Sequence, residues 1–454
     1  MLQYVFKLEM MSGGDECFFQ DDSRNKLNII AYKKYQKFET EEIRKVLVKR
    51  AVPFRRIRSC VVKFLGKYMF YDLGEEHTLK EAPKRLVAKS GIHTEQELAD
   101  FMCAEQCTRE PLGSFQWKVW LIEDYSETES VFVWKVHHSL ADGIALVMFF
   151  SNLCDNPKLE DLPPITTRFT FLQKLGQLIA IPLYMIVLSI KLLLILPVEQ
   201  NGIKTEEVKQ ALTDHKQATF CPSISTDLIK TRAKALGCTF NDILMTCVSR
   251  SLKQYLEEQA GDKDTQKIRL ACPFSLRAAP KTVDGVTMNN NFAILPLKLN
   301  LVDNLDTGLE RIKKDMLALK HSIQPIGYFY LVKLTMQLPE FARSFLLELM
   351  CEKMSIGFSN VPGPKRPWVV GGKAVDALGF FMPVGKSLCA SISICSHAST
   401  VKVGVVADKA AMKDPRDLLV YFENNLDQML GEEWREFDKR DSRRQVPCSA
   451  TPTE

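Results

Sequence analysis

Strand-like and helix-like segments alternate along most of this sequence, and the alternation predicts an α/β (α+β) fold built from two domains. The chain has 454 residues, which exceeds the length at which a single hydrophobic core stops growing. With 46% hydrophobic and 25% charged residues, its composition is that of an ordinary globular protein. Disordered, collagenous and small disulfide-stapled proteins are thereby excluded.

Charge and cysteine content indicate what the protein binds and in which compartment it lies. The chain has 60 basic and 55 acidic residues. This small positive net charge is too weak to indicate nucleic-acid binding, but it is compatible with a weak attraction to anionic membrane surfaces. The thirteen cysteines are odd in number and irregularly spaced, so we expect reduced thiols in a cytosol-facing protein. Cys103 and Cys107 lie four apart on a predicted helix, but no second pair or nearby histidine completes a zinc set, and we assign no metal.

The first predicted domain spans residues 1–165. Leu27–Tyr32 is predicted to be a strand, and Glu41–Lys49 a helix whose apolar residues share one side, with Thr40 as its N-cap. The other elements predicted for this half are a strand pair in Val61–Leu73 that turns at Gly66-Lys67, a helix at Glu95–Glu105, strands at Trp117–Glu123 and Val131–Val136, and a helix at Ile144–Leu153.

A change in composition marks a linker at residues 166–212. Within it, Leu175–Val198 is apolar apart from Lys191 and is long enough to cross a bilayer core of ~30 Å. Two prolines, Pro182 and Pro197, interrupt the run. A re-entrant or interfacial hairpin kinked at Pro182 and a linker helix buried against the body of the protein are both compatible with this segment.

The second predicted domain spans residues 213–436 and precedes a charged tail, residues 437–454. A helix at Asp227–Leu236 is expected to end at Gly237, because glycine commonly terminates helices. The other predicted elements are a helix at Asn241–Glu257, strands at Ile268–Pro273 and Phe292–Leu301, helices at Leu305–His321 and Leu331–Met354, strands at Ser355–Ser359, Ala374–Phe381, Leu388–Cys395 and Thr400–Val406, and a helix at Pro415–Leu430.

The candidate chemistry lies in Val131–Gly143, VFVWKVHHSLADG. Strand alternation sends Trp134 and His138 to one face and His137 to the other. If the aromatic face is the buried one, His138 arrives at the strand end partly desolvated, and burial keeps its imidazole a neutral base near pH 7. Asp142-Gly143 then forms a tight turn that starts the following helix.

The competing interpretation is a core histidine whose hydrogen bonds are made within the protein, beside an ordinary turn. For a lone histidine this interpretation is the better one. The chain has only seven histidines, however, and two adjacent ones closely precede an Asp-Gly turn. The agreement of several residues at fixed spacing favours a functional site.

His137-His138-Ser139-Leu140-Ala141-Asp142-Gly143 resembles the HHxxxDG signature of the coenzyme A-dependent acyltransferase superfamily, which includes chloramphenicol acetyltransferase and peptide-synthetase condensation domains. Further segments resemble its bifunctional wax ester synthase/diacylglycerol acyltransferase family. They are Asn241-Asp242 at a helix start, Pro273-Phe274-Ser275-Leu276-Arg277 at a strand end, Met288–Leu297 (MNNNFAILPL), Ser359-Asn360-Val361-Pro362-Gly363-Pro364 and Gly404-Val405-Val406-Ala407-Asp408. The likeness extends from about Asp15 to Leu430.

The resemblance implies two chloramphenicol-acetyltransferase-like sandwich domains with a central channel that reaches His138. It implies that His138 accepts the proton of an alcohol while the alcohol oxygen attacks the thioester carbonyl of acyl-CoA. No nucleophilic serine or cysteine is then needed, and acyl-CoA is a co-substrate, with no cofactor expected. In relatives the aspartate corresponding to Asp142 turns away from substrate and pairs with an arginine. Arg277 is the candidate partner here, with a surface arginine as the alternative interpretation.

Attack on the thioester creates an oxyanion, which needs positioned hydrogen-bond donors. The Gly143 N–H and the Asn241 side chain are candidates, although Asn241-Asp242 is equally well explained as a helix start capped by Asn241. Ser359 and Asn360 are expected either to line the channel or to form a rigid turn.

A site shared by both halves requires them to lie on one side of the membrane, so the resemblance favours the hairpin for Leu175–Val198. We therefore expect a membrane-associated, cytosol-facing enzyme at the endoplasmic reticulum, plasma membrane or lipid-droplet surface. Its partners would be acyl-CoA and a long-chain alcohol or diacylglycerol, and not nucleic acid. Two alternatives stay open: acylation of a small soluble alcohol or amine, and a non-catalytic lipid-binding protein of the same fold.

Overall fold

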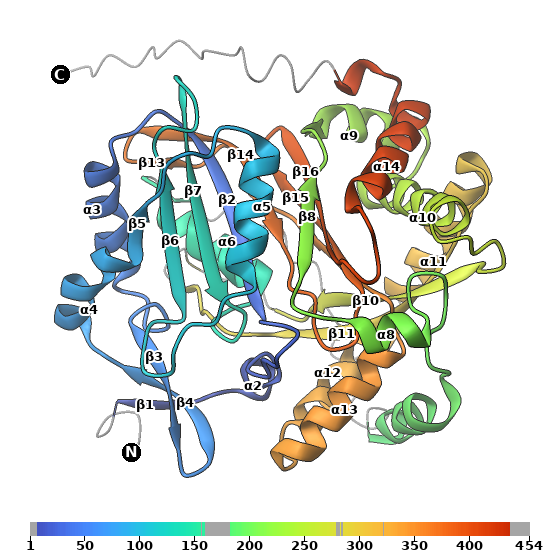
Figure 1. Cartoon of the computed structure of the whole chain (residues 1–454), viewed down its shortest axis with the longest axis horizontal. Coiled ribbons are helices and arrows are strands. Elements are labelled where there is room, and N and C mark those ends of the chain that lie inside the picture. The colour runs from blue at the N-terminus through green and yellow to red at the C-terminus, as the bar shows by residue number, and fades with distance from the viewer. Residues whose placement is uncertain are drawn as a thin grey trace.

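Two large sheets stand side by side in the molecule, one on each side of the view in Figure 1. The computed structural model describes residues 7–155, 157–158, 182–277, 282, 285–320 and 322–435. Helices pack against both sheets, and the predicted α/β (α+β) fold class with two sandwich-like halves is confirmed.

The sheet of the N-terminal half has six strands in the order β13-β14-β2-β7-β6-β5. They are β2 (Asn28–Gln36), β5 (Leu86–Ala88), β6 (Trp117–Ile122), β7 (Glu129–His137), β13 (Val369–Val370) and β14 (Lys373–Phe381). Strand β7 lies between β2 and β6 and is antiparallel to both, with Asn28 opposite His137. The strand that leads to the two histidines is therefore held from both sides.

Side chains of β7 alternate between two cores, as predicted. Phe132 and Trp134 pack with α3 (Thr40–Ala51) and α6 (Gly143–Asn152). Val133 points to the other face and packs with α5 (Glu95–Gln106). Both faces of the strand are buried, because helices or the second half of the protein cover each of them.

The second sheet has seven strands in the order β11-β10-β12-β15-β16-β8, with β9 also paired to β16. They are β8 (Lys216–Phe220), β9 (Ile224–Ser225), β10 (Lys267–Ser275), β11 (Phe292–Asn300), β12 (Ile356–Val361), β15 (Ala390–His397) and β16 (Thr400–Asp408). One face packs against α9 (Thr226–Ala235), α10 (Phe240–Glu258), α11 (Leu305–Lys320) and α14 (Pro415–Leu430). Residues on the other face, including Ala271 and Ile294, border a cavity between the halves.

One hairpin crosses the predicted domain boundary. By sequence β13 and β14 belong to the predicted domain 213–436, yet β14 pairs antiparallel with β2 and completes the N-terminal sheet. Without β14, strand β2 would be an edge strand with unpaired N–H and C=O groups. A division of the sequence into contiguous pieces did not predict this shared sheet.

Most predicted elements are present with ends shifted by a few residues, but two predictions are wrong. The predicted helix Leu331–Met354 is two helices, α12 (Gln324–Thr335) and α13 (Glu340–Glu352), because Pro339 stands at the N-cap of α13 and cannot continue a helix. Thr40 is the first residue of α3 rather than its N-cap. Elements that the sequence analysis did not predict are β1 (Leu8–Met10), α2 (Gly13–Cys17), α4 (Glu75–Glu81), β5, α8 (Glu206–Ala211), β8, β9 and β13.

A small sheet and a short helix close the lower edge of the N-terminal half in Figure 1. The sheet has the order β1-β4-β3, with β3 (Ser59–Phe64) and β4 (Lys67–Asp72) forming the predicted strand pair. Helix α2 follows β1 and is started by a capping box between Ser12 and Asp15. This helix brings the N-terminal segment against the loop that carries the histidines.

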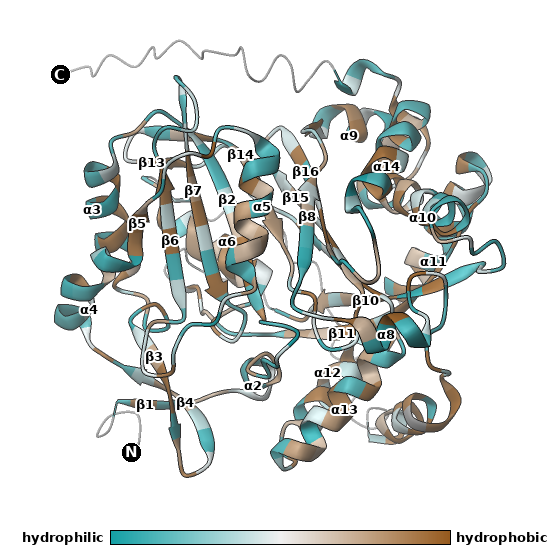
Figure 2. Ribbon diagram, in the orientation of Figure 1, coloured by the Kyte–Doolittle hydropathy of each residue, from teal (hydrophilic) through white to brown (hydrophobic). Residues whose placement is uncertain are grey.

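The described part of the apolar linker segment is a helix at residues 182–190 that continues as a π-helical turn, Lys191–Ile195. Leu188 is buried on its inner side and packs against α12 at Gly327, where a Cβ would come within 2.6 Å of Leu188. The outer side is apolar but exposed (Figure 2), at Leu183, Ile186, Val187, Ile190 and Leu194.

The segment thus packs inward on one side and leaves its other side exposed, so it is not a fully buried helix. Within the parts of the chain that are described, no helix has the length and apolar character needed to cross a bilayer. Residues 175–181 lie outside the described residues, as does the chain before the predicted kink at Pro182.

Candidate active site

The two histidines lie where β7 ends and the loop to α6 begins. His138 lies one residue beyond the end of β7, so strand alternation no longer decides where its ring points. Its N–H donates to the carbonyl of Leu27 (2.8 Å), which ties the loop to the start of β2. Asp142 then caps α6 by accepting the Ala145 N–H on its side chain (2.8 Å).

The imidazole of His138 lies in an aromatic, apolar environment. Its ring stacks on Phe18 at a centroid distance of 3.8 Å, and Phe292 lies tilted at 5.8 Å. Only 7% of the residue is exposed. Burial lowers the pKa of His138 to about 4, outweighing its backbone hydrogen bond and the nearby Asp142 charge, which both favour the proton. The ring is therefore neutral at pH 7.

The side-chain amide of Asn290 decides which ring nitrogen carries the proton. Its Nδ2 lies within hydrogen-bond distance of three acceptors: Asp15 Oδ1 (3.0 Å), the His138 carbonyl (2.8 Å) and the Ser139 carbonyl (3.3 Å). Its Oδ1 therefore faces His138 Nδ1 at 3.1 Å, and an amide oxygen can only accept. A neutral His138 thus carries its proton on Nδ1. Its Nε2 has no partner among the described residues and keeps a free lone pair.

His137 is held in a different way. Its Nδ1 lies 2.8 Å from the Ser139 hydroxyl and also accepts the Ser139 N–H (3.3 Å). Its Nε2 therefore carries a proton and faces Asp21 Oδ1 at 3.3 Å. Both ring nitrogens are engaged within the protein, and the residue does not line the cavity. We assign His137 a role in holding the loop rather than in contacting substrate.

The predicted pair of Asp142 and Arg277 is present. Arg277 Nη2 lies 2.7 Å from Asp142 Oδ2, and both side chains are buried. Arg277 also donates to the carbonyls of Thr287 (3.0 Å) and Asn289 (2.7 Å), and the Asn291 N–H donates to Asp142 (2.9 Å). The alternative of a surface arginine is wrong. The pair fastens the histidine loop of one half to the segment before β11 of the other.

Gly143, the first residue of α6, lies where there is no room for a side chain. A Cβ at this position would come within 3.0 Å of Val361 Cγ2 at the end of β12. The N–H groups of Gly143 and Ile144 have no acceptor among the described residues, because the first amides of a helix lack partners in the helix itself. Together with the helix dipole, such free N–H groups favour negative charge beside them.

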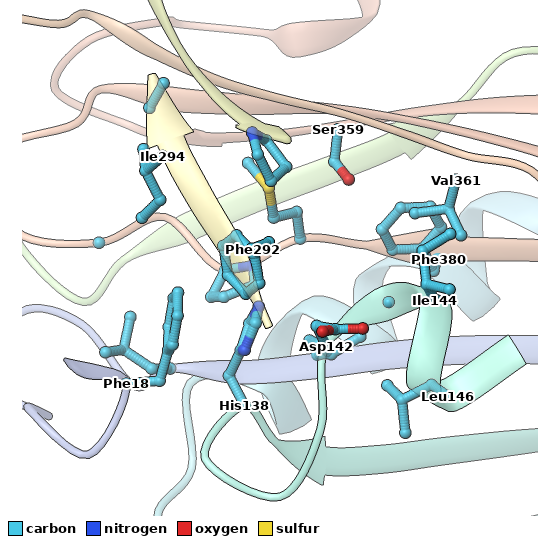
Figure 3. A pocket seen from close by; sticks show the side chains of 18 of the residues that line it. Phe18, His138, Asp142, Ile144, Leu146, Phe292, Ile294, Ser359, Val361 and Phe380 are labelled. Atoms are coloured by element: carbon cyan, nitrogen blue, oxygen red, sulfur yellow. The ribbon is translucent and has the colours of Figure 1, made fainter. Parts of the chain in front are cut away.

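A cavity of about 380 Å³ lies between the two halves, and His138 forms part of its wall. Figure 3 shows the imidazole projecting into it between Phe18 and Asp142. Residues with polar side chains in the wall are His138, Asp142, Ser275, Ser359, Asn360 and Lys386. The rest is largely apolar and comes from both halves, including Leu27, Ile29, Leu146, Phe150, Phe292, Ile294, Leu347, Met350 and Met354.

Comparison with known proteins shows which family this arrangement resembles. A model of the WS/DGAT C-terminal domain matches residues 289–430. A putative diacylglycerol O-acyltransferase of Mycobacterium tuberculosis is 22% identical over 366 residues, covering 74% of this chain and 75% of that protein. Wax ester synthase/diacylglycerol acyltransferase 5 of Arabidopsis thaliana is 22% identical over 387 residues, covering 75% of each chain. Over about three quarters of its length the chain is therefore similar to proteins named wax ester synthase/diacylglycerol acyltransferase and diacylglycerol O-acyltransferase.

A solved structure of the same family agrees with the architecture. The wax ester synthase/diacylglycerol acyltransferase of Marinobacter aquaeolei VT8 superposes with a TM-score of 0.65 at 17% identity, covering 93% of this chain and 98% of that one. At this identity the likeness concerns the fold. The fold and the named relatives together identify the protein as an acyltransferase.

In this acyltransferase, Asn241 and Asp242 lie outside the cavity. Thr239 is the N-cap of α10 and forms a capping box with Asp242, whose Oδ2 accepts the Thr239 N–H (2.8 Å). The predicted N-cap role of Asn241 is therefore wrong, and the Asp242 carboxylate is engaged in the capping box. Asn241 Oδ1 accepts from Asn360 Nδ2 (2.8 Å), so it reaches the cavity only through Asn360. Ser359 and Asn360 both line the cavity, as one of the two predictions for them requires.

Sequence analysis of this acyltransferase missed three residues that surround the base: Asp15, Phe18 and Asn290. Asn290 lies in MNNNFAILPL, where three consecutive asparagines before an apolar strand were the available signal. Asp15 and Phe18 belong to α2 and its C-cap. A helix of five residues is too short for hydrophobic periodicity to reveal it, so no local pattern indicated these two residues.

Proposed function

We propose that this enzyme transfers a fatty acyl group from acyl-CoA to the hydroxyl of a long-chain alcohol or diacylglycerol, with His138 as general base. The observation that carries the proposal is the neutral, Nδ1-protonated imidazole whose free Nε2 borders an apolar cavity shared by both halves. The printed names of the relatives, diacylglycerol O-acyltransferase and wax ester synthase, support the acceptor class.

The reaction follows from the free lone pair. His138 Nε2 takes the hydroxyl proton while the alcohol oxygen bonds to the thioester carbon. The tetrahedral intermediate then collapses, the carbon–sulfur bond breaks, and the imidazolium returns its proton to the departing thiolate. The products are an ester and free coenzyme A, and the base ends in its starting state. Because burial disfavours a charged His138, the imidazolium readily gives up its proton.

The oxyanion of the intermediate requires donors near the carbonyl. The start of α6 supports Gly143 in this role, because its N–H is free and the residue lines the cavity next to Asp142. Asn360 is the second candidate, since its side chain lines the same wall and Asn241 holds its amide group (2.8 Å). Asn241 therefore has an indirect role in this proposal, because it orients the Asn360 amide.

A lipid surface is the proposed place of action, on the cytosolic side of the endoplasmic reticulum, the plasma membrane or a lipid droplet. Apolar side chains are exposed along residues 182–195 and on α12 and α13, including Leu194 (81%), Leu334 (58%) and Phe341 (79%). Helix α13 also lines the cavity with Leu347 and Met350. One helix thus connects the exposed apolar face to the proposed acyl site.

Labelled palmitoyl-CoA offered with hexadecanol, dioleoylglycerol or butanol tests the reaction. We expect ester with one or both lipid acceptors, and about a 10³-fold loss of kcat in His138→Ala. Turnover of butanol alone would favour the small-alcohol alternative. Lipid binding without turnover of any acceptor would favour the non-catalytic alternative.

Flotation with vesicles of phosphatidylcholine and phosphatidylserine tests the lipid surface. Ile186→Asp with Leu194→Asp places charges on the exposed side of the 182–195 helix and is expected to reduce vesicle binding at least tenfold. Leu317→Asp is the matched control, because Leu317 is an exposed leucine of α11 (57%) on the far side of the C-terminal sheet from the cavity. Equal binding of wild type and both variants would contradict association through this face.

A further inference from the structure

Behind the base lies a hydrogen-bond chain that begins in the N-terminal segment. His138 Nδ1 donates to Asn290 Oδ1 (3.1 Å), and Asn290 Nδ2 donates to Asp15 Oδ1 (3.0 Å). The Asn290 N–H donates to the same carboxylate oxygen (3.0 Å). The other oxygen, Asp15 Oδ2, accepts from Arg56 Nη2 (3.0 Å) and the Ser12 hydroxyl (2.8 Å). Asp15 has no exposed surface, so every partner of its carboxylate comes from the protein.

This chain fixes the orientation of the Asn290 amide. If the amide were flipped, its oxygen would face a carboxylate oxygen of Asp15 and the carbonyls of His138 and Ser139, all acceptors, and its NH2 group would face His138 Nδ1. Three acceptor–acceptor contacts in a buried site strongly disfavour the flipped amide, since each leaves polar groups without a hydrogen bond. A flipped amide would also require Nδ1 to accept, which moves the ring proton to Nε2 and removes the lone pair that faces the cavity.

Close packing of α2 supports the same arrangement. A Cβ on Gly14 would come within 2.5 Å of the Asn290 carbonyl oxygen, so only glycine allows α2 to approach Asn290 this closely. The residue after α2, Phe18, stacks on the His138 ring. One short segment therefore supplies both the carboxylate behind Asn290 and the aromatic face against the base.

We propose that Asp15 and Asn290 are positioning residues for acyl transfer, which hold His138 in the Nδ1-protonated form and keep Nε2 available as the base. The inference rests on the proposed function for its catalytic consequence, but not for the tautomer itself. Asn290 is the direct hydrogen-bond partner of the base, and Asp15 acts through Asn290. The role resembles that of the third member of a catalytic triad, here divided between a neutral amide and a carboxylate behind it.

An amide next to Nδ1 has an effect that a carboxylate would not have. It accepts the Nδ1 proton without adding a full charge beside the ring, so it fixes the tautomer and leaves the base neutral. The titratable groups around His138 are Asp142, the adjacent His137 and, behind Asn290, Asp15 of α2. Arg277 neutralises Asp142, and Arg56 neutralises Asp15.

Asp15→Asn and Asn290→Ala test the proposal in the full-length enzyme, with Asn291→Ala as control. Asp15→Asn keeps the shape of the side chain but removes the charge that orients Asn290. The Asn291 side chain makes no hydrogen bond among the described residues. Two readouts are needed: kcat and KM for acyl transfer, and the ¹⁵N chemical shifts of His138 in histidine-labelled protein, which distinguish the two tautomers without substrate.

We expect the wild type and Asn291→Ala to show the Nδ1-protonated form. Asp15→Asn and Asn290→Ala should show loss of that form and a roughly 100-fold lower kcat with KM changed less than threefold. Wild-type tautomer and kcat in both variants would overturn the proposal. If the wild type acylates none of the acceptors, the proposed function fails, and the chemical shifts alone still decide whether Asp15 and Asn290 fix the tautomer.

Discussion

His137 and His138 are neighbours in the chain and both are buried, the first as the last residue of β7 and the second as the first residue after it, yet their rings carry opposite tautomers. His137 is protonated on Nε2, with Asp21 at 3.3 Å, and accepts on Nδ1. His138 is protonated on Nδ1 and leaves Nε2 free. The difference does not come from the local backbone. It comes from what each ring meets in the folded protein.

The comparison shows that burial alone does not make a base. His137 has partners for both ring nitrogens, so it has no lone pair to offer. His138 has a partner for one nitrogen and a cavity beside the other, and burial lowers its pKa to about 4. A neutral ring with one unsatisfied nitrogen in an apolar wall is costly for folding, and such a cost is typical of a site kept for function.

The largest expected effect comes from truncating each ring in turn. We expect His138→Ala to lower kcat about 10³-fold, because the general base is lost. His137→Ala is expected to lower kcat less than tenfold. The comparison is made by measuring kcat of the two variants and the wild type at the same pH. A loss in His137→Ala as large as in His138→Ala would show that the two rings do not have separate roles.

Disturbing the loop that holds both rings is expected to have the next largest effect. Arg277→Ala leaves Asp142 charged and buried without its partner, which costs about 3–5 kcal/mol of folding free energy. Equilibrium unfolding in urea measures the loss. Arg277→Ala combined with Asp142→Ala removes both charges and is expected to be less destabilised than the sum of the two single variants. Strict additivity would show that the pair is not coupled.

A smaller effect is expected where Asp21, the partner of His137, is changed. Burial by itself raises the pKa of Asp21, but hydrogen bonds from His137 and the Leu27 N–H lower it below its usual value overall. A carboxyl pKa depressed in the folded state adds stability above the unfolded-state pKa, and this stability is lost as pH falls through the folded value. We expect Asp21→Asn to cost about 1–2 kcal/mol at pH 7, with kcat nearly unchanged, and to reduce the acid sensitivity of unfolding.

The pH dependence of the wild type separates catalysis from stability. Since the folded-state pKa of His138 is about 4, against ~6.5 for an unfolded chain, the unfolded state binds more protons between these values. Stability from this group is therefore full above pH 6.5 and declines as pH falls toward 4. The acid limb of kcat/KM should lie near pH 4, and a limb near pH 6.5 would mean that the base is solvated.

The sequence predicted the elements that depend on local patterns. Alternation along β7, the Asp-Gly helix start and the glycine at the end of α9 follow from side-chain periodicity and backbone preferences, which act over a few residues. The pairing of Asp142 with Arg277 was predicted through the resemblance to a family rather than from the residues themselves.

What the sequence by itself determined is thus the α/β (α+β) class, most of the strands and helices, and the position of the candidate base at the end of a buried strand. Only the tertiary structure decided that β14 would complete the sheet of the other half, that Asn241 would stand behind Asn360, and that Asp15, Asn290 and Phe18 would surround His138. These contacts join residues far apart in the sequence: Asp15 and Asn290 are 275 positions apart, and Phe381 of β14 pairs with Ile30 of β2, 351 positions away. Periodicity and capping act within a few residues, so they carry no information about which distant side chains meet.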